Sequence, residues 1–532
     1  MQQPITGKQL IGFSEISAGQ ETFQSINPAT GEANPWHFSE ATSGEIDQAV
    51  GLAARSFEAY SRTPGNRRAA FLHTIADQLE SDRKSLVAVY MQESGLPEGR
   101  ANGELGRTTA QLRSFAELVD EGSWVQARID TAQSDREPLP KPDIRKCLMP
   151  LGPVVVFGAS NFPFAFSTAG GDTASALAAG CPVVVKGHPM HPATGELVAR
   201  AVIQAVRKSK MPEGVFSYLQ GTSRSLGEQL VKHPCIAAAG FTGSRAGGLA
   251  LSAIAAGREV PIPFFAEMGS VNPVVLLPTA LDPKAGWAKS YAGSVTLGVG
   301  QFCTNPGLLF GIEGPGLDRF GKALAGEVAA IPPACMLHPN MAGNFMEMRN
   351  ALGQQPGVRY LTSDDPPAGT NEVPATVAVV GGSDFTGNPK LQQEVFGPFT
   401  LLVSCRDVQE LESALVSLEG QLTASVLGTE EEFRNHPGVL DKLRSKAGRI
   451  LFNGVPTGVE VCPSMHHGGP FPATTDSRYT SVGTDAILRW VRPLSFQNCP
   501  QSLLPEVLRN TNPGGVWRLV DGTWSDESII TL

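Results

Sequence analysis

The sequence predicts an α/β protein built from two doubly wound domains and a small β-sheet arm. From Pro153 to about residue 455, short Val-, Ile- and Leu-rich stretches typical of strands alternate with amphipathic stretches typical of helices. Such alternation indicates mostly parallel sheets with helices on both faces. Strand-like pieces also occur at 122–148 and 487–491. The 532 residues are enough for two or three domains that each have a core.

The first part of the chain, residues 1–121, is expected to be mainly helical. Short extended pieces over 8–36 end in a turn rich in Asn, Pro and Gly. Thr42 and Glu45 have the spacing of a capping box. Apolar residues at helical period predict three further helices, at about 67–80, 84–93 and 104–119. These helices are expected to form a layer that covers another part of the protein.

Residues 122–148 are expected to form an arm. Two strand-like pieces, 124–129 and 144–148, flank a polar, Pro-rich linker. Strands of this kind, and the one expected at 487–491, present backbone groups that a second subunit can pair with. The sequence therefore predicts a homo-oligomer.

The first alternating unit covers residues 149–266. Its expected strands are 154–157, 183–186, 215–219 and 236–241, and its expected helices are 169–179, 193–206, 226–231 and 245–256. The alternation restarts at Val274, which defines a second unit over 267–455. Residues 456–532 are expected to return to the first unit, add an arm strand and end in a surface tail. Ligands of such sheets bind at the carboxyl ends of the strands.

Composition and charge exclude several classes of partner. The net charge is -9 and the basic residues form no cluster, so neither nucleic acid nor a membrane surface is expected as a partner. We predict no signal peptide and no membrane span. The eight cysteines form no CxxC pair and no zinc-like spacing with histidine, which suits a cytoplasmic protein without a metal. The ligand is expected to be a small molecule.

Cys303 differs from the other cysteines in its surroundings. It follows Gly298 and Gly300, which let the backbone approach a ligand and leave the sulfur accessible. An isolated carboxylate, Glu267, lies 36 positions earlier (303 minus 267). On these residues alone, Cys303 is either a nucleophile or a buried structural cysteine.

Four further features lie at the ends of strands or beside rigid turns. Asn161 is suited to donate to an oxyanion, or is a turn residue. Lys186 is suited to a ribose or phosphate, or is a solvated lysine. Gly243-Ser244 opens a helix whose N–H groups suit a pyrophosphate, although such turns also serve packing. Glu394 and Phe396 precede a Gly-Pro turn, where the alternative is a core position for the ring.

Together, these motifs resemble the aldehyde dehydrogenase superfamily. The similarity extends over nearly the whole chain, in the family's order, through Phe23 with 27–32, Asn161-Phe162-Pro163, Lys186, 241–244, Glu267-Met268-Gly269, Gly300-Gln301-Phe302-Cys303 and Glu394-Val395-Phe396-Gly397-Pro398. It implies a Rossmann-like NAD(P)-binding domain at 149–266, a catalytic domain at 267–455, and a homodimer or homotetramer.

The resemblance also implies a role for each of these residues. Cys303 attacks the aldehyde carbon, and Asn161 with the Cys303 N–H holds the oxyanion. Glu267 activates the water that hydrolyses the thioester, for which a partly apolar pocket is expected to raise its pKa. The implied cofactor-binding residues are Lys186, His188, Arg224, Gly243, Ser244, Gly269, Glu394 and Phe396.

The sequence also bears on cofactor choice. NAD-preferring members often carry an acid three residues after the lysine, and here that position is Pro189. A 2′-phosphate therefore meets no carboxylate there, while His188 and Arg224 are placed to supply positive charge. NADP is the expected cofactor, with NAD as the alternative. The other interpretation of Arg224 is a surface arginine.

The segment from Asn453 to Pro470 narrows the resemblance to the 2,5-dioxovalerate (α-ketoglutaric semialdehyde) dehydrogenases and NADP-dependent bacterial fatty-aldehyde relatives. The implied product is 2-oxoglutarate. Within the segment, His466 and His467 are adjacent, and adjacent histidines rarely face one metal ion. No third ligand is evident, so we expect them to shape the substrate funnel. Arg478 and the two histidines are candidates for the cation that binds a substrate carboxylate.

Three alternatives remain open at this point. A broad medium- or long-chain aldehyde dehydrogenase would use the same catalytic residues, with Phe162, Phe164 and Phe166 lining an apolar tunnel. A non-catalytic binding protein would be expected to have lost Cys303 or Glu267, and both are present. A thioester hydrolase that uses Cys303 and Glu267 without a nucleotide is the third.

Overall fold

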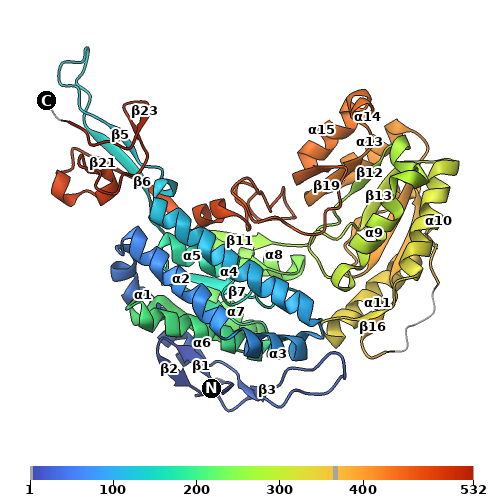
Figure 1. The fold of residues 1–532 in the computed structure, drawn as a ribbon, viewed down its shortest axis with the longest axis horizontal. Coiled ribbons are helices and arrows are strands. Elements are labelled where there is room, and N and C mark those ends of the chain that lie inside the picture. The colour runs from blue at the N-terminus through green and yellow to red at the C-terminus, as the bar shows by residue number, and fades with distance from the viewer. Residues whose placement is uncertain (1–3, 364–368, 531–532) are drawn as a thin grey trace.

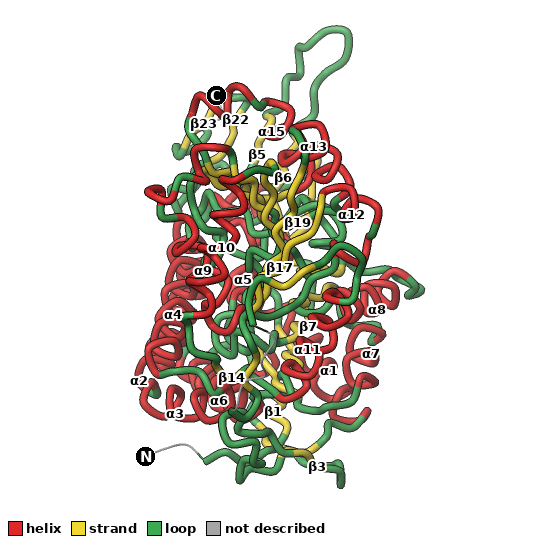
Figure 2. The backbone as a smooth tube through the Cα atoms, turned by 90° about the vertical axis from the view of Figure 1, so that its right-hand side faces the viewer, coloured by secondary structure: helices red, strands yellow, loops and turns green. Residues whose placement is uncertain are grey.

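The computed structural model describes residues 4–363 and 369–530, and it confirms the α/β prediction. Two seven-stranded sheets form the centres of two lobes, and a five-stranded sheet projects from the first lobe (Figure 1). Turned by 90°, the strands run through the middle of the molecule with helices on both sides (Figure 2). This is the layered arrangement that alternating strands and helices predict.

The first sheet has the strand order β11-β10-β7-β8-β9-β1-β2. Its parallel strands are β7 (Val154–Phe157), β8 (Val183–Lys186), β9 (Phe216–Leu219), β10 (Ala238–Thr242) and β11 (Phe264–Glu267). The edge strands β1 (Gln9–Ile11) and β2 (Ser14–Ile16) are antiparallel. The central strands are valine-rich because both faces of the sheet are buried.

Helices cover both faces of this sheet. They are α1 (Ser43–Ser61), α2 (Gly65–Ser81), α3 (Arg83–Ser94), α4 (Glu98–Glu121), α5 (Gly171–Ala179), α6 (Pro192–Lys208), α7 (Arg224–Lys232) and α8 (Arg245–Ala256). Val154 and Val156 pack on the side of α2 to α6, whereas Val155 packs on the side of α1 and α7. The predicted capping box of Thr42 and Glu45 is present at the start of α1.

The second sheet has the order β15-β17-β18-β13-β12-β19-β20. Its strands are β12 (Val274–Leu276), β13 (Leu308–Ile312), β15 (Arg359–Tyr360), β17 (Thr376–Gly381), β18 (Phe399–Cys405), β19 (Gln421–Leu427) and β20 (Ala447–Phe452), of which β15 is antiparallel. The surrounding helices are α9 (Trp287–Thr296), α10 (Pro315–Ala329), α11 (Pro339–Gly353), α12 (Gly382–Gly387), α13 (Val408–Ser417), α14 (Glu430–Asn435) and α15 (Pro437–Lys446). Two short pairs complete the strands, β3 (Thr22–Phe23) with β4 (Phe38–Ser39), and β14 (Ala334–Cys335) with β16 (Glu372–Val373).

The projecting sheet is the predicted arm, with two corrections. Its order is β21 (Val491–Gln497), β6 (Ile144–Pro150), β5 (Arg128–Asp130), β22 (Arg518–Val520) and β23 (Thr523–Ser525). The expected strand start at Trp124 is wrong, because Ser123–Val125 is a 3₁₀ helix between left-handed residues. The strand expected at 487–491 is also a 3₁₀ helix, Thr484–Trp490, whose apolar side chains are buried against the first lobe.

After β20 the chain returns to the first lobe. The Met268 N–H donates to the Ala473 carbonyl, and the Thr475 N–H donates to the Ala266 carbonyl, so this segment lies beside the end of β11. Within 4–363 and 369–530, no helix is long and apolar enough to cross a membrane.

Candidate active site

A cavity of about 340 Å³ lies at the carboxyl ends of the strands, with walls from both lobes. Eight of the residues singled out in the sequence line it, namely Asn161, Gly243, Ser244, Glu267, Gly269, Cys303, Glu394 and Phe396. The cavity therefore joins most of the predicted catalytic and cofactor-binding residues in one place.

The backbone before Cys303 makes a left-handed turn that presents the sulfur. Gly298, Val299 and Gly300 have φ of 56°, 59° and 65°. A side chain at Gly300 would place its Cβ 2.2 Å from the backbone of Gly397, so only glycine fits. Val299 is a β-branched residue with positive φ, a strained conformation that concentrates at functional sites. The Asn272 amide holds the Cys303 carbonyl at 2.9 Å.

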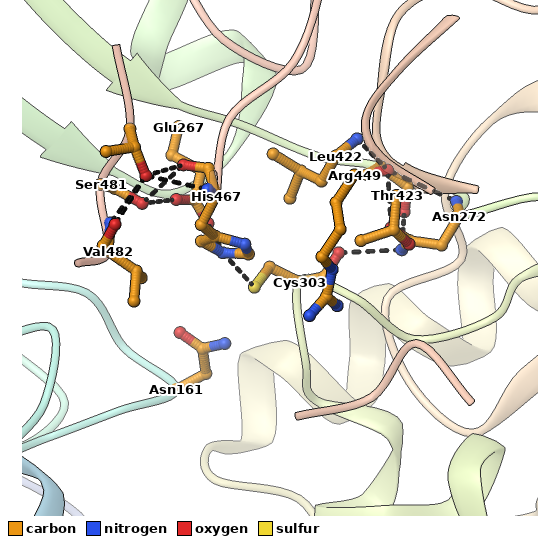
Figure 3. Close-up of polar contacts among 12 residues, drawn as sticks. Asn161, Glu267, Asn272, Cys303, Leu422, Thr423, Arg449, His467, Ser481 and Val482 are labelled. Carbon is orange, nitrogen blue, oxygen red and sulfur yellow. Dashed lines mark hydrogen bonds and ion pairs between the residues drawn. The ribbon is translucent and has the colours of Figure 1, made fainter. Parts of the chain in front are cut away.

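The sulfur belongs to a hydrogen-bonded group with His467, Glu267 and Ser481 (Figure 3). His467 Nε2 lies 3.3 Å from Cys303 Sγ and 3.0 Å from Glu267 Oε1. The Ser481 hydroxyl donates to the other carboxylate oxygen. His467 Nε2 is close to both a thiol and a carboxylate, so it is best placed as an N–H donor shared between them.

His467 is the main residue of the site that the sequence does not predict to lie beside Cys303 and Glu267. His466 and His467 are expected from the sequence to shape the substrate funnel. In the structure His467 is buried, and its backbone N–H donates to Thr480 Oγ1 at 2.8 Å, which fixes its position. No third ligand was evident in the sequence, yet the ligand atoms of Glu267, Cys303 and His467 lie within 4.8 Å of one another. Hydrogen bonds account for this cluster. The only sequence signal was a histidine beside a Gly-Gly-Pro turn.

The charge state of Glu267 differs from the expectation. Burial alone raises the pKa of this carboxyl, but His467 and the hydrogen bonds from His467, Ser481 and Cys303 outweigh it and lower the pKa below the usual value. The predicted upward shift is therefore wrong, and Glu267 is ionised at neutral pH. Burial and the neighbouring Glu267 raise the pKa of the Cys303 thiol well above its usual value. The resting sulfur is thus protonated beside an ionised base.

Asn161 lies near the start of the loop between β7 and α5, with its amide turned toward the Cys303 sulfur (Figure 3). Asn161 Nδ2 donates to the Gln301 carbonyl at 3.1 Å, which leaves its second N–H available. Among the described residues, the Cys303 N–H has no acceptor. Two N–H groups are therefore free beside the thiol, as an oxyanion site requires.

The residues around Glu394 fit a nicotinamide nucleotide. Glu394 accepts one long hydrogen bond, from the Ser270 N–H at 3.4 Å, and burial raises its pKa to about 7. A Cβ at Gly269 would lie 2.3 Å from the Glu394 carboxylate, so glycine keeps the space beside it open. Gly243-Ser244 opens α8, whose N-terminal N–H groups suit a pyrophosphate.

Lys186, His188 and Arg224 do not line this cavity. Lys186 ends β8, His188 follows it, and Arg224 opens the helix after β9. The ends of β8 and β9 lie side by side, with Lys186 opposite Leu219. Burial lowers the pKa of His188 well below its usual value, so the expected positive charge on this imidazole is absent. A carboxylate does lie nearby, because Glu40 interacts with Lys186 and accepts hydrogen bonds from Thr222. Arg224 is exposed at the start of α7.

An aromatic wall borders the thiol. Phe162 and Phe302 meet edge to face at 5.2 Å between ring centroids, and Phe166 packs 5.5 Å from Phe162. Arg107 of α4 lies over Phe162 and Phe166, and no motif in the sequence marks it. Its one signal is its helical spacing from the buried polar residues Glu104, Thr108 and Gln111.

Comparison with known proteins decides the family. Residues 16–470 match the "Aldehyde dehydrogenase family". The chain belongs to this family. Its curated relatives include "Alpha-ketoglutaric semialdehyde dehydrogenase 2" of Azospirillum brasilense, 47% identical over 97% of this chain and 99% of that protein. Another is "Alpha-ketoglutaric semialdehyde dehydrogenase" of Acinetobacter baylyi, 46% identical over 97% of this chain and 98% of that protein. The chain is therefore an aldehyde-oxidising enzyme.

Solved structures agree on the fold of this aldehyde dehydrogenase. The betaine aldehyde dehydrogenase of Staphylococcus aureus, solved in complex with NAD+, has a TM-score of 0.79 and covers 93% of this chain and 96% of its own. At 20% identity, this likeness concerns the fold alone.

Proposed function

We propose that this enzyme oxidises 2,5-dioxopentanoate to 2-oxoglutarate with NAD(P) as the oxidant. The observation that supports this chemistry is the hydrogen-bonded group of Cys303, His467 and Glu267, two of which, Cys303 and Glu267, line the cavity between the lobes. The near-full-length relatives named α-ketoglutaric semialdehyde dehydrogenase support the substrate.

The first step is addition of the thiol to the aldehyde. Glu267 takes the proton of Cys303, and the thiolate attacks the carbonyl carbon. The Asn161 amide and the Cys303 N–H donate to the oxyanion that forms. The shared N–H of His467 stabilises the thiolate before attack. Because this donor lies between the sulfur and the carboxylate, it can donate a hydrogen bond to whichever of the two is negatively charged.

The second step is hydrolysis of the thioester on Cys303. NAD(P), when bound, supplies the oxidant that accepts the hydride of the aldehyde carbon. Loss of the hydride from the oxyanion adduct leaves a thioester on Cys303, and Glu267 releases to solvent the proton that it took from the thiol. The ionised carboxylate then removes a proton from a water molecule as the water attacks the thioester, and the sulfur leaves as thiolate. Because Glu267 is ionised at rest, it is in the form that a base requires. The carboxylic acid product and the free cysteine complete the cycle.

Glu394 and Phe396 would hold the nicotinamide end of the cofactor, and the start of α8 its pyrophosphate. Lys186 and Arg224 would hold the adenosine end. Pro189 in place of an acid and the exposed Arg224 support NADP, whereas Glu40 beside Lys186 supports NAD by offering a carboxylate to ribose hydroxyls. We retain NADP as the proposed preference.

The substrate and cofactor proposals are tested by one set of measurements. The values of kcat/KM for 2,5-dioxopentanoate, pentanal and a long-chain aldehyde are determined with NADP and with NAD. We expect the highest value for 2,5-dioxopentanoate with NADP, and Arg224→Gln is expected to lower only the NADP values. Equal values for the semialdehyde and the long-chain aldehyde would contradict the substrate proposal.

A broad medium- or long-chain aldehyde dehydrogenase is the second candidate function. The apolar wall of Phe162, Phe166 and Phe302 continues into Val459, Val461 and Met465, and these residues can also enclose a hydrocarbon chain. The long-chain aldehyde in the set above decides between the two candidates.

Glu394 predicts a pH-dependent affinity for the cofactor. Its pKa of about 7 means that it gains its charge as pH rises through neutrality, and a carboxylate accepts ribose hydroxyls better than a carboxylic acid does. In Cys303→Ala protein, NAD(P)H affinity measured by fluorescence is expected to rise about tenfold between pH 6 and 7.5. The pKa of Lys186, about 8, keeps most of this lysine charged up to pH 7.5, and its partial loss of charge acts against the expected rise.

In the same Cys303→Ala background, adding Glu394→Gln is expected to give weaker affinity that does not change over this pH range. A rise that persists in the Gln variant would assign the titration to another group.

His467→Gln is expected to lower the steady rate of aldehyde oxidation about 100-fold, because the thiolate loses a preorganised donor. It is also expected to move the pH profile of Cys303 alkylation by iodoacetamide upward. His466→Gln is the matched control, since the half-buried neighbour has no described contact with Cys303 or Glu267. An unshifted alkylation profile in His467→Gln would contradict the role of the shared N–H.

We infer that the enzyme is a homodimer or homotetramer. In the arm, β21 is an outer strand of its sheet and is paired on one side, by β6. Exposed Leu139 and Leu503 lie on the segments that flank β6 and β21, and exposed Trp524 lies on β23 at the other edge of the sheet. Light scattering of the purified enzyme is expected to give at least twice the mass of one chain, and a monomer would contradict the inference.

A further inference from the structure

Arg107 is a half-buried cation whose guanidinium has no anionic partner among the described residues. Its Nε and Nη2 atoms are buried, and among the described residues they have no hydrogen-bond partner. The desolvation of a guanidinium is offset only where an anion or several acceptors face it. An arginine kept in this state beside an active site is suited to bind an anionic ligand.

The neighbouring carboxylates are already engaged. Glu104, one turn before Arg107 on α4, accepts the N–H groups of Phe164 and Ala165, at 2.8 and 3.0 Å. It also accepts the Tyr90 hydroxyl at 2.7 Å and Arg100 Nε at 3.3 Å. Glu267 is held by His467 and Ser481. The described carboxylates therefore leave the free side of the Arg107 guanidinium unpaired.

Arg107 also lies within reach of the reacting centre. Its guanidinium carbon is 5.3 Å from the centre of the Phe166 ring and 5.9 Å from that of Phe162. Phe162 contacts Phe302, which directly precedes Cys303, and the Phe166 ring lies 6.4 Å from that of His467. The charge of Arg107 acts on both Cys303 and Glu267. Arg107 and Cys303 therefore border the same group of aromatic rings, Phe162, Phe166 and Phe302.

The geometry points to Arg107 as the residue that binds the distal carboxylate of the substrate, and this assignment rests on the proposed function. Four carbon–carbon bonds separate the aldehyde carbon and the carboxylate carbon of 2,5-dioxopentanoate, about 5 Å when extended. Nε and Nη2 form the fork that pairs with a carboxylate through two parallel hydrogen bonds. The rings of Phe162 and Phe166 pack against the carbons between the two ends.

Two other arginines near the site have acceptors of their own. Arg449 lies near Cys303 (Figure 3), and its Nη2 donates to the carbonyl of Pro456 at 2.8 Å, so it anchors the loop after β20, although its buried Nε has no partner among the described residues. Arg478, a candidate from the sequence, is exposed and paired with Asp476 through two hydrogen bonds of 2.9 and 2.6 Å. These contacts favour Arg107 over Arg478 as the residue that binds the substrate carboxylate.

The test uses the ratio of kcat/KM for 2,5-dioxopentanoate to that for pentanal. Both substrates use the same thiol, so the ratio cancels any effect of Arg107 on its reactivity. Arg107→Met, which keeps the length of the side chain, is expected to lower the ratio about 100-fold. Arg107→Lys is expected to restore part of the loss, and Arg478→Gln is expected to leave the ratio unchanged.

Binding without catalysis gives a second measurement. Glutarate, a five-carbon dicarboxylate, is expected to raise the Tm of the wild type and of Arg478→Gln but not that of Arg107→Met. If the wild type does not prefer 2,5-dioxopentanoate over pentanal, the proposed function is wrong. If the wild type prefers it and Arg107→Met keeps both the ratio and the glutarate shift, only the assignment to Arg107 is wrong.

Discussion

Cys303→Ala is expected to lower aldehyde oxidation by about 10⁵-fold or more, because the covalent path is lost with the nucleophile. The sulfur interacts with two side chains, His467 and Glu267, which also hold each other, so the fold is expected to persist. Steady-state NAD(P)H production measures the activity, and fluorescence titration with NAD(P)H verifies that the cofactor cavity remains intact.

The matched control for this variant is Cys235→Ala. Cys235 is an exposed free thiol outside the cavity, and its replacement is expected to leave the rate unchanged. If the Cys303→Ala protein retained a rate within tenfold of the wild type, covalent catalysis by Cys303 would be ruled out.

Glu267→Gln is expected to separate the two half-reactions. Gln can still accept hydrogen bonds from Ser481 or His467, but it cannot remove a proton from water. The steady rate is expected to fall about 10³-fold through slow hydrolysis. A first turnover that releases about one NAD(P)H per active site is expected to persist, and intact-mass spectrometry is expected to find the acyl group on Cys303.

Hydroxylamine provides the control for Glu267→Gln. This nucleophile attacks a thioester without help from a base, so it is expected to raise the steady rate of the Gln variant but to change that of the wild type little. A steady rate equal to that of the wild type, without hydroxylamine, would remove Glu267 from the role of base in hydrolysis.

Local sequence patterns predict most of the fold. The valine-rich strands and the helix from the Thr42 capping box form where expected, because burial on both sheet faces and helix capping are short-range signals. The errors at Trp124 and at 487–490 have one cause. A short apolar run does not distinguish a strand from a buried 3₁₀ turn, and the outcome depends on packing partners far along the chain.

Some residues of the site could likewise be predicted from local sequence patterns, and others could not. Asn161, Glu267 and Cys303 carry local motifs, and the structure places all three at one cavity. His467 and Arg107 have no local motif that identifies a role, because their significance arises from contacts across 200 and about 60 residues, with Glu267 and the Phe162–Phe166 loop. The direction of the Glu267 pKa shift was wrong for the same reason. The pocket is buried as expected, but the donors that lower the pKa come from the last part of the chain.

The return of the chain to the first lobe has a consequence for protein synthesis. Glu267 and Cys303 emerge from the ribosome well before His467 and Ser481, which complete their hydrogen bonds. Ser481 lies 178 residues after Cys303 (481 minus 303), and the arm strands β21 to β23 come later still. Since chains fold from the N-terminus as they are made, the nascent lobes hold a thiol that lacks its His467 donor. We therefore expect full reactivity toward aldehydes only after the segment with His467 and Ser481 has been made.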